Sequence, residues 1–241
     1  MPDYYFPLKE RKEIAEETMA FTLDTSGSNF PFIAGQYADF TLEKPPFNDI
    51  KGKTRPFSIA SSPLEKGSIM FATRMRDSAF KNSLKQISLG TKISVSSARG
   101  SFVLHDDAKQ SAVFLAGGIG ITPIRSIIET AGLEKKPHKL FLFYSNRTPS
   151  ATAFLHDFEK FAKQNQNFKF FPTITQLEGV KDWKYPTGRI KFKMIEENVP
   201  ELKNAIFYIS GPNAMVSAMR QVLAVGKIKS GNIVTEEFSG Y

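Results

Sequence analysis

The chain has 241 residues, enough for one large domain or two modest ones with a buried core. Lysine and arginine outnumber aspartate and glutamate by 32 to 24, giving a net charge of +8, and 41% of the residues are apolar. The chain contains no cysteine. This excludes a disulfide scaffold, a cysteine nucleophile, a cysteine-ligated zinc site and a cysteine-held iron–sulfur cluster within these residues.

The positive charge is compatible with nucleic acid, an anionic membrane or an acidic protein as partner. The basic residues are scattered through the sequence, so we expect no nucleic-acid binding. No apolar run approaches the ~20 residues that span a bilayer. The first residues carry charges where a signal peptide needs an apolar stretch. We therefore expect a cytoplasmic protein without a membrane span.

Residues 1–107 alternate short, apolar-patterned segments with turn formers, which predicts an antiparallel β-barrel. A helix is expected at residues 78–86, since Phe80, Leu84 and Ile87 recur at three- or four-residue spacing. The strands expected in this half lie at residues 18–24, 36–42, 55–60, 69–75 and 92–97.

From Ser111 onward, apolar strands and helical patterns alternate, which predicts a doubly wound α/β domain over residues 108–241. The polar segment 104–110 is expected to join the two domains. Helices are expected near residues 124–131 and 151–163. Five strands are expected to form a parallel sheet, at residues 111–116, 139–145, 168–173, 205–210 and 232–236.

A glycine-rich run, Ala-Gly-Gly-Ile-Gly-Ile-Thr-Pro at residues 116–123, joins the first of these strands to its helix. Glycines allow close approach of a phosphate, and a helix N-terminus offers free N–H groups. We expect Thr122 as the N-cap and Pro123 as the first helical residue. A turn that makes only a tight connection is the alternative. The candidate nucleotide-binding residues are Gly117, Gly118, Gly120, Thr122 and Pro123.

The second parallel strand ends in Tyr-Ser-Asn-Arg at residues 144–147, without the acid that binds a ribose diol in the Rossmann fingerprint. The hydroxyl of Ser145 and the guanidinium of Arg147 suit a 2′-phosphate better. We therefore expect NADPH in preference to NADH. A solvated loop arginine is the alternative for Arg147.

Four motifs, in order across residues 55–241, resemble those of the ferredoxin–NADP reductase family. Arg-Pro-Phe-Ser at 55–58 resembles the flavin motif Arg-x-Tyr-Ser, with Phe57 in place of tyrosine. The glycine-rich run resembles the nicotinamide pyrophosphate turn. Ser-Gly-Pro at 210–212 resembles the Cys-Gly-Pro motif, and residues 236–241 resemble the family's aromatic ending. The resemblance implies a flavin barrel followed by a nicotinamide domain, without a fused iron–sulfur domain.

On this resemblance, FAD and a reduced nicotinamide nucleotide are the implied cofactors. Arg55 would pair with the flavin pyrophosphate, Phe57 would pack against the isoalloxazine, and Ser58 would hydrogen-bond near its N5. Backbone N–H groups that open the following helix would also hold the pyrophosphate, which favours FAD over FMN. These belong to Lys81, Asn82 and Ser83.

Ser58, Ser210 and Phe238 are the residues implied at the hydride path, with Phe238 stacked on the isoalloxazine. A place in the core is the alternative for Phe71, Phe80 and Met215. The histidines His105, His138 and His156 have no metal-ligand spacing and are expected at the surface. The other implied cofactor contacts are Pro56, Phe71, Thr73, Phe80, Gly211, Pro212, Met215 and Tyr241.

The implied reaction passes hydride from NAD(P)H to FAD and then electrons to a separate acceptor. The charge of +8 favours an acidic ferredoxin or flavodoxin as that acceptor. A reductase of a free small acceptor (flavin, quinone, ferric chelate or dioxygen) is one alternative. A non-catalytic nucleotide-binding sensor is another, and a nucleic-acid binder would rest on the charge alone.

Overall fold

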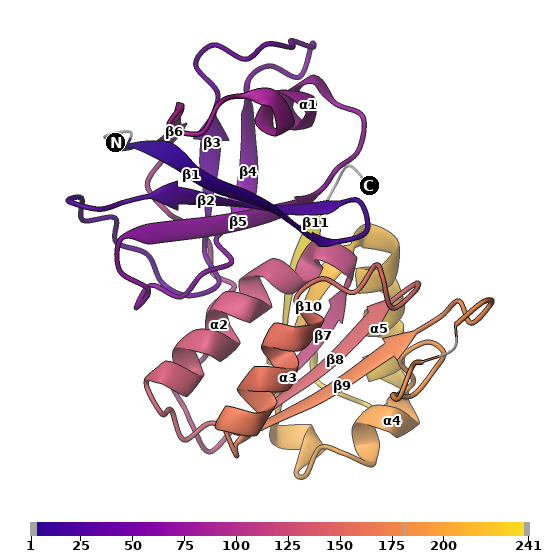
Figure 1. The fold of residues 1–241 in the computed structure, drawn as a ribbon. Helices are drawn as coiled ribbons and strands as arrows, with labels where there is room; N and C mark the ends of the chain where they lie inside the picture. The colour runs from indigo at the N-terminus through magenta and orange to yellow at the C-terminus, as the bar shows by residue number, and fades with distance from the viewer. Residues whose placement is uncertain (1–3, 181, 239–241) are drawn as a thin grey trace.

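The structure, a computed structural model, describes residues 4–180 and 182–238. These residues form an antiparallel sheet of six strands followed by a parallel sheet of five. Figure 1 shows the first sheet as an upper domain, indigo to magenta, and the second in a layered domain below it. Both parts of the predicted fold class are confirmed.

The upper domain is a small barrel with strand order β4-β3-β6-β1-β2-β5. An isolated antiparallel bridge between Ile59 and Phe71 joins the ends of the order, next to β4 and within β5. One helix, α1 (Ala79–Gln86), lies against the barrel, as predicted. The strands are β1 (Tyr4–Ala15), β2 (Thr18–Asp24), β3 (Tyr37–Thr41), β4 (Thr54–Ser58), β5 (Ser68–Arg74) and β6 (Lys92–Val95).

Phenylalanine rings fill the barrel. Phe21, Phe40 and Phe71 are fully buried, with ring centroids of Phe71 at 5.3 Å from Phe21 and 4.3 Å from Phe40. The alternation of side chains along β2 and β5 places these rings on the same inner face. Much of the chain's unusual content of 22 phenylalanines is therefore accounted for by packing.

The lower domain is a parallel sheet in the order β11-β10-β7-β8-β9, with helices α2 and α3 on one face and α4 and α5 on the other (Figure 1). The five predicted parallel strands are confirmed. The strands are β7 (Ala112–Gly117), β8 (Leu140–Asn146), β9 (Phe168–Ile174), β10 (Ile206–Pro212) and β11 (Ile233–Phe238), and the helices are α2 (Ile121–Leu133), α3 (Leu155–Gln164), α4 (Phe192–Glu196) and α5 (Asn213–Val225).

Helix α2 begins earlier than the sequence predicts. A 3₁₀ turn, Gly118–Gly120, leads directly into Ile121, and Gly120 is the N-cap. Thr122 is therefore inside the first turn, where its Oγ1 donates to the carbonyl of Ile119 at 3.1 Å, and Pro123 is the third helical residue. The expectation that Thr122 caps the helix is wrong, because the glycine turn supplies the cap itself.

The last barrel strand ends at Val95 and the parallel sheet begins at Ala112, with the predicted division after residue 107 in between. In this connection the half-buried His105 packs beside His138, with ring centroids 5.1 Å apart. The Nε2 atom of His138 lies 2.9 Å from the His105 carbonyl, and burial lowers the pKa of His138. The expectation that both are surface residues is wrong, because they fill the space under the connection; His156 is exposed.

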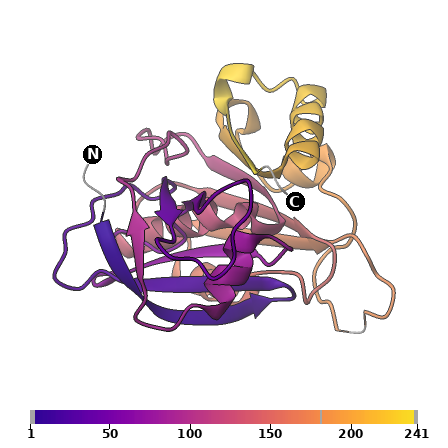
Figure 2. The same cartoon turned by 90° about the horizontal axis from the view of Figure 1, so that it is seen from above.

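The barrel lies over the carboxyl edge of the parallel sheet, while α4 and α5 lie to one side of it (Figures 1 and 2). Strand β11 ends beside the barrel, so the end of the described chain returns to the domain interface. Among the described residues, no helix is both long and apolar enough to cross a bilayer.

Candidate functional site

Three polar side chains from distant parts of the chain gather where the barrel meets the sheet. Ser58, the last residue of β4, donates from Oγ to Glu236 Oε2 at 3.4 Å. Ser210 on β10 is directly paired in register with Glu236 on β11. The Ser210 hydroxyl is buried and has no hydrogen-bond partner among the described residues. A buried hydroxyl without a partner points to a ligand atom that completes it.

Glu236 was not predicted from the sequence as a site residue. Burial raises the pKa of its carboxyl group to about 7, which the hydrogen bond from Ser58 opposes only in part. A carboxyl group with a near-neutral pKa at a domain interface is a common feature of functional sites. The sequence signal was an acid at the first residue of the aromatic ending, and its pairing with Ser210 became visible only in the structure.

The two glycine turns pack against each other, and most of their glycines serve that contact. A Cβ on Gly120 would lie 2.4 Å from the Ser210 carbonyl oxygen. A Cβ on Gly117 or Gly211 would lie 2.4 Å or 2.8 Å from the sulfur of Met215. Packing alone therefore requires glycine at these three positions, and Met215 fills the space between the turns. Their contact with a nucleotide stays a prediction.

Gly118 is different, because it has a φ of +54° and a Cβ added there would meet no atom within 4 Å. Its carbonyl accepts a hydrogen bond from the buried Tyr144 hydroxyl at 3.1 Å, which fixes the turn from below. Gly118 thus offers the open backbone face that a phosphate needs. Nearby, Pro212 pairs in register with the half-buried Phe238 at the sheet edge, whereas Tyr241 lies outside the described residues.

The predicted flavin motif forms the outer end of the aromatic barrel core. Phe57 is half-buried and stacks on Phe71, with ring centroids 4.8 Å apart. Phe71 and Phe80 are themselves fully buried, so both have the core role that was the alternative. Pro56 is exposed, and Thr73 is buried with its hydroxyl 3.4 Å from the Arg74 carbonyl. Phe57 is the ring of this group that remains accessible to a planar ligand.

Arg55 organises the loop that precedes β4. Its Nη1 donates to the carbonyl oxygens of Lys51, Gly52 and Thr54 at 2.7–2.9 Å, and its Nη2 lies 3.3 Å from Asp49 Oδ1. The other oxygen of Asp49 accepts a hydrogen bond from the backbone N–H of Ala79 at 3.2 Å. Arg55 is therefore held beside the start of α1, where the resemblance implies a pyrophosphate.

The backbone N–H groups expected to hold that pyrophosphate are partly used within the protein. The N–H groups of Lys81 and Asn82 donate to the side chain and carbonyl of Ser78. Ser83 is buried, and its hydroxyl bonds the backbone of Phe47. The Lys81 side chain, whose Nζ donates to the Arg74 carbonyl at 2.8 Å, is the better candidate for an anion contact.

Positive charge is concentrated around Lys81. Burial and the charges of Arg76, Arg55, Arg74 and Lys51 lower the pKa of Lys81 to about 8. A lysine loses its proton more easily where positive charge is in excess. A bound dianionic pyrophosphate would supply the missing negative charge, so these residues fit the phosphate part of FAD.

A cavity of about 270 Å³ opens at the carboxyl end of β8 and β9, beside the start of α5. Ser145 and Arg189 contribute polar groups to it, and Met215 contributes part of its apolar wall. Arg147 is exposed and does not line this cavity. The sequence thus identified Ser145 but missed Arg189, which reaches the cavity because the Gly188 N–H is bonded to the Ile174 carbonyl at the end of β9.

Together these groups fit a flavin and a nicotinamide nucleotide that meet at the domain interface. The barrel side offers Phe57, Ser58 and the charge around Lys81. The sheet side offers Gly118 and the free hydroxyl of Ser210. Within residues 4–180 and 182–238 there is no cluster of three or more acidic or histidine side chains that could hold a metal ion.

Comparisons with known proteins agree with this arrangement. Residues 114–221 match the model of the oxidoreductase NAD-binding domain family. The chain is 27% identical to the F component of the Na(+)-translocating NADH-quinone reductase of Pseudoalteromonas atlantica, over 89% of this chain and 62% of that protein. It is 25% identical to the phenol hydroxylase P5 protein of Acinetobacter pittii, over 98% and 65%. The chain spans between 49% and 65% of the length of these curated relatives and others like them.

Solved structures share the fold. The FAD/NAD-binding domain of nitric oxide dioxygenase from Vibrio cholerae superposes with a TM-score of 0.84 at 17% identity, covering 97% of this chain and 98% of that one. A ferredoxin NADP+ reductase from Neisseria gonorrhoeae superposes with a TM-score of 0.79 at 18% identity, covering 98% of each chain.

A barrel with a flavin-type motif, followed by a nicotinamide-type α/β domain, defines a two-domain oxidoreductase. In its fold and in the matched NAD-binding domain, the chain is similar to the flavin-dependent NAD(P)H oxidoreductases of the ferredoxin–NADP reductase family. The family resemblance inferred from the four motifs is thereby confirmed.

The raised pKa of Glu236 predicts a pH-dependent stability of the flavin-free protein. A carboxyl group whose pKa rises from 4.5 to about 7 on folding favours the folded state at low pH, and that contribution is lost as the pH rises through about 7. Between about pH 5 and pH 8, the wild type should therefore lose about 2 kcal/mol of unfolding free energy that Glu236→Gln does not lose. Urea unfolding at both pH values measures this.

The neighbouring Glu237→Gln is the matched control, because it removes one carboxylate from the same strand at an exposed position and leaves Glu236 in place. A Glu236→Gln variant that follows the wild-type pH dependence would contradict the assigned pKa.

Proposed function

We propose that this chain binds FAD, takes hydride from NADPH and delivers the electrons to an acidic ferredoxin or flavodoxin, in the cytoplasm. The convergence of Ser58, Ser210 and Glu236 at the domain interface carries the proposal. When bound, FAD supplies the redox chemistry, in which the hydride (one proton with two electrons) from nicotinamide C4 is accepted at flavin N5 and the electrons are passed on singly.

The side chains of this chain align the cofactors and control one proton. The Ser58 hydroxyl would hydrogen-bond the N5 edge, and the Phe57 ring would support the isoalloxazine face. Ser210 Oγ, which lacks a partner among the described residues, is available to the nicotinamide. With a pKa of about 7, Glu236 can hold a proton at a carboxyl oxygen or release it near neutral pH.

Flavin loading and its reduction test the proposal. The purified protein should be yellow, or become yellow with FAD, and NADPH added without oxygen should bleach it. Electron delivery should then be compared among a ferredoxin, a flavodoxin, free flavin, a quinone and a ferric chelate. A protein that takes up no flavin would instead support the sensor module, and transfer only to small molecules would support the free-acceptor reductase.

Removal of Arg55 should weaken flavin binding. Arg55→Ala should lower FAD affinity by about ten- to a hundredfold, since a charge-assisted hydrogen bond contributes ~1.5–3 kcal/mol. Arg11→Ala is the matched control, because Arg11 also bonds two backbone carbonyls, of Lys85 and Ile87, but at the other end of α1. Fluorescence titration measures both affinities. Unchanged FAD affinity in Arg55→Ala would mean that the flavin site is misplaced.

The acceptor part of the proposal rests on charge. The net charge of +8 favours association with an acidic protein, which electrostatic attraction accelerates. The curated relatives carry names of reductase and hydroxylase components, which is compatible with an acceptor on another protein.

The preference for NADPH rests on the polar groups at the end of β8. Ser145 and Arg189 line the cavity there, and Arg147 lies on the adjoining loop. Both arginines are exposed, and their side chains make no hydrogen bond or ion pair with another described residue. A hydroxyl and a guanidinium can donate to a 2′-phosphate, whereas NADH selectivity usually requires an acid at this place.

Arginine substitutions separate the two positions. Arg189→Ala should lower kcat/KM for NADPH by roughly five- to thirtyfold and leave NADH nearly unaffected. Arg147→Ala should have a smaller effect, because Arg147 lies outside the cavity. Steady-state kinetics with both nucleotides measures this. A wild type that prefers NADH, or equal losses for both nucleotides, would contradict the preference, and a larger loss in Arg147→Ala would return the role to Arg147.

A further inference from the structure

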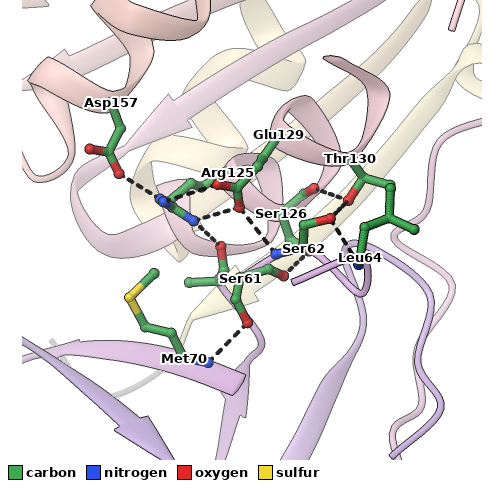
Figure 3. A network of polar contacts seen from close by, with 10 residues as sticks. Ser61, Ser62, Leu64, Met70, Arg125, Ser126, Glu129, Thr130 and Asp157 are labelled. Atoms are coloured by element: carbon green, nitrogen blue, oxygen red, sulfur yellow. Dashed lines mark hydrogen bonds and ion pairs between the residues drawn. The ribbon is translucent and has the colours of Figure 1, made fainter. Parts of the chain in front are cut away.

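Arg125, at the domain interface, contacts both the barrel and its own α/β domain. Arg125 on α2 is only 8% exposed, and Figure 3 shows its guanidinium surrounded by acceptors. Nη1 donates to the Ala60 carbonyl of the barrel at 2.8 Å and to Glu129 Oε2 at 2.9 Å. Nε donates to Asp157 Oδ2 on α3 at 2.8 Å. A buried guanidinium is stable only when paired in this way on several sides.

The barrel segment that Arg125 reaches is held residue by residue. Glu129 Oε2 accepts the backbone N–H of Ser62 at 3.1 Å, and Ser126 Oγ donates to the Ser61 carbonyl at 2.6 Å. The hydroxyl of Ser62 lies 2.8 Å from that of Thr130 (Figure 3). The four α2 residues of this network are spaced to lie on one face of the helix. They are Arg125, Ser126, Glu129 and Thr130.

Both ends of this network are next to the candidate site in the sequence. Ala60 lies two residues after Ser58, the end of the flavin motif. Arg125 lies in the second turn of α2, whose start is the Gly118–Gly120 turn. The network therefore joins the flavin side to the nicotinamide side by a short and rigid route, although the residues are 65 positions apart in the chain.

We propose that Arg125 is a positioning residue, which sets the angle between the barrel and the α/β domain and thereby aligns the two cofactors. The alignment of cofactors rests on the proposed function, but the fixing of the domain angle does not. Hydride transfer requires the reacting atoms at ~3–3.5 Å, so a small rotation of one domain would slow the reaction without removing either binding site.

The charged and aromatic neighbours of residue 125 explain why this position requires an arginine. Burial raises the pKa of Glu129, although the neighbouring Arg125 opposes this. The rings of Phe154 and Phe161 lie 5.1 Å and 5.7 Å from the guanidinium carbon, within the range of a cation–π contact. A lysine has one compact ammonium group and cannot reach Ala60, Glu129 and Asp157 together.

The two kinds of contact made by Arg125 can be separated by substitution. The double variant Arg125→Gln/Glu129→Gln removes the charged bonds to Ala60, Ser62 and Asp157. The one carboxylate that it leaves without its partner, that of Asp157, is 40% exposed. Asp157→Asn is the matched control, because Asp157 and Arg125 both belong to the α/β domain and this change leaves the barrel contacts in place. If the double variant does not fold, Arg125→Lys, which retains the positive charge, is used in place of the double variant in the two measurements described next.

The domain angle can be measured directly, because the chain has no cysteine of its own. Spin labels on Lys92→Cys in β6 and Lys163→Cys in α3 report the distance between the domains by double electron–electron resonance. We expect one narrow distance distribution in wild type and in Asp157→Asn, and a broad one in the double variant. The flavin reduction rate of the FAD-loaded double variant should fall by about 10- to 100-fold, with FAD affinity and the KM for NADPH nearly unchanged.

A narrow distribution in the double variant, or a broad one with an unchanged reduction rate, would overturn the proposal. If Asp157→Asn loses as much rate as the double variant, the role of Arg125 is confined to the α/β domain and the proposal is likewise overturned. If wild type binds no FAD, the proposed function fails, and the distance distributions still decide whether Arg125 fixes the domain angle.

Discussion

All strands of a parallel sheet end at the same edge, and in this protein the barrel lies over that edge (Figure 1). The polar ends of β10 and β11 therefore meet the end of β4, although Ser58 and Glu236 are 178 positions apart. Burial of that edge leaves Ser210 Oγ without a partner in the described chain and raises the pKa of Glu236. The same constraint creates both the site and its unusual electrostatics.

A site divided between two domains requires the domains to stay in register. The glycines achieve this within the α/β domain, because Gly120 allows the first turn to pack on the Ser210 carbonyl. Between the domains, Arg125 and its neighbours on α2 bond each of the residues 60–62. Rigid packing and a short polar network thus share the task, and Gly118 remains as the open backbone face.

Much of the architecture followed from sequence patterns of short range. Apolar runs and glycine signals predicted the five parallel strands, and the motif at residues 55–58 marked the flavin side. Strand β1 was missed, since its charged residues at 9–13 hide the alternation of the buried Phe6 and Leu8. Helix α2 was predicted to start too late, because a glycine cap has no side chain that signals it.

The site itself was predicted in part. Ser58, Ser210 and Gly118 stand where the motifs imply a ligand, but Phe71 and Phe80 are core residues. An aromatic residue in a strand or helix has the same pattern whether it contacts a cofactor or the core.

Glu236, Arg189 and Arg125 acquire their roles only through contacts between distant segments. Local patterns do not encode such contacts. The family motifs do not include Arg125 or Arg189, and they include Glu236 only as the first residue of the aromatic ending.

In the proposed function, the interface brings a nicotinamide directly against a flavin. Anaerobic reduction of the FAD-loaded protein by NADPH carrying deuterium at one or the other C4 position tests it most directly. Because a fixed domain angle exposes one face of the nicotinamide, flavin reduction should slow with one deuterated form and proceed at the normal rate with the other. Equal rates with both forms and with unlabelled NADPH at every nucleotide concentration, or no flavin reduction at all, would contradict the claim.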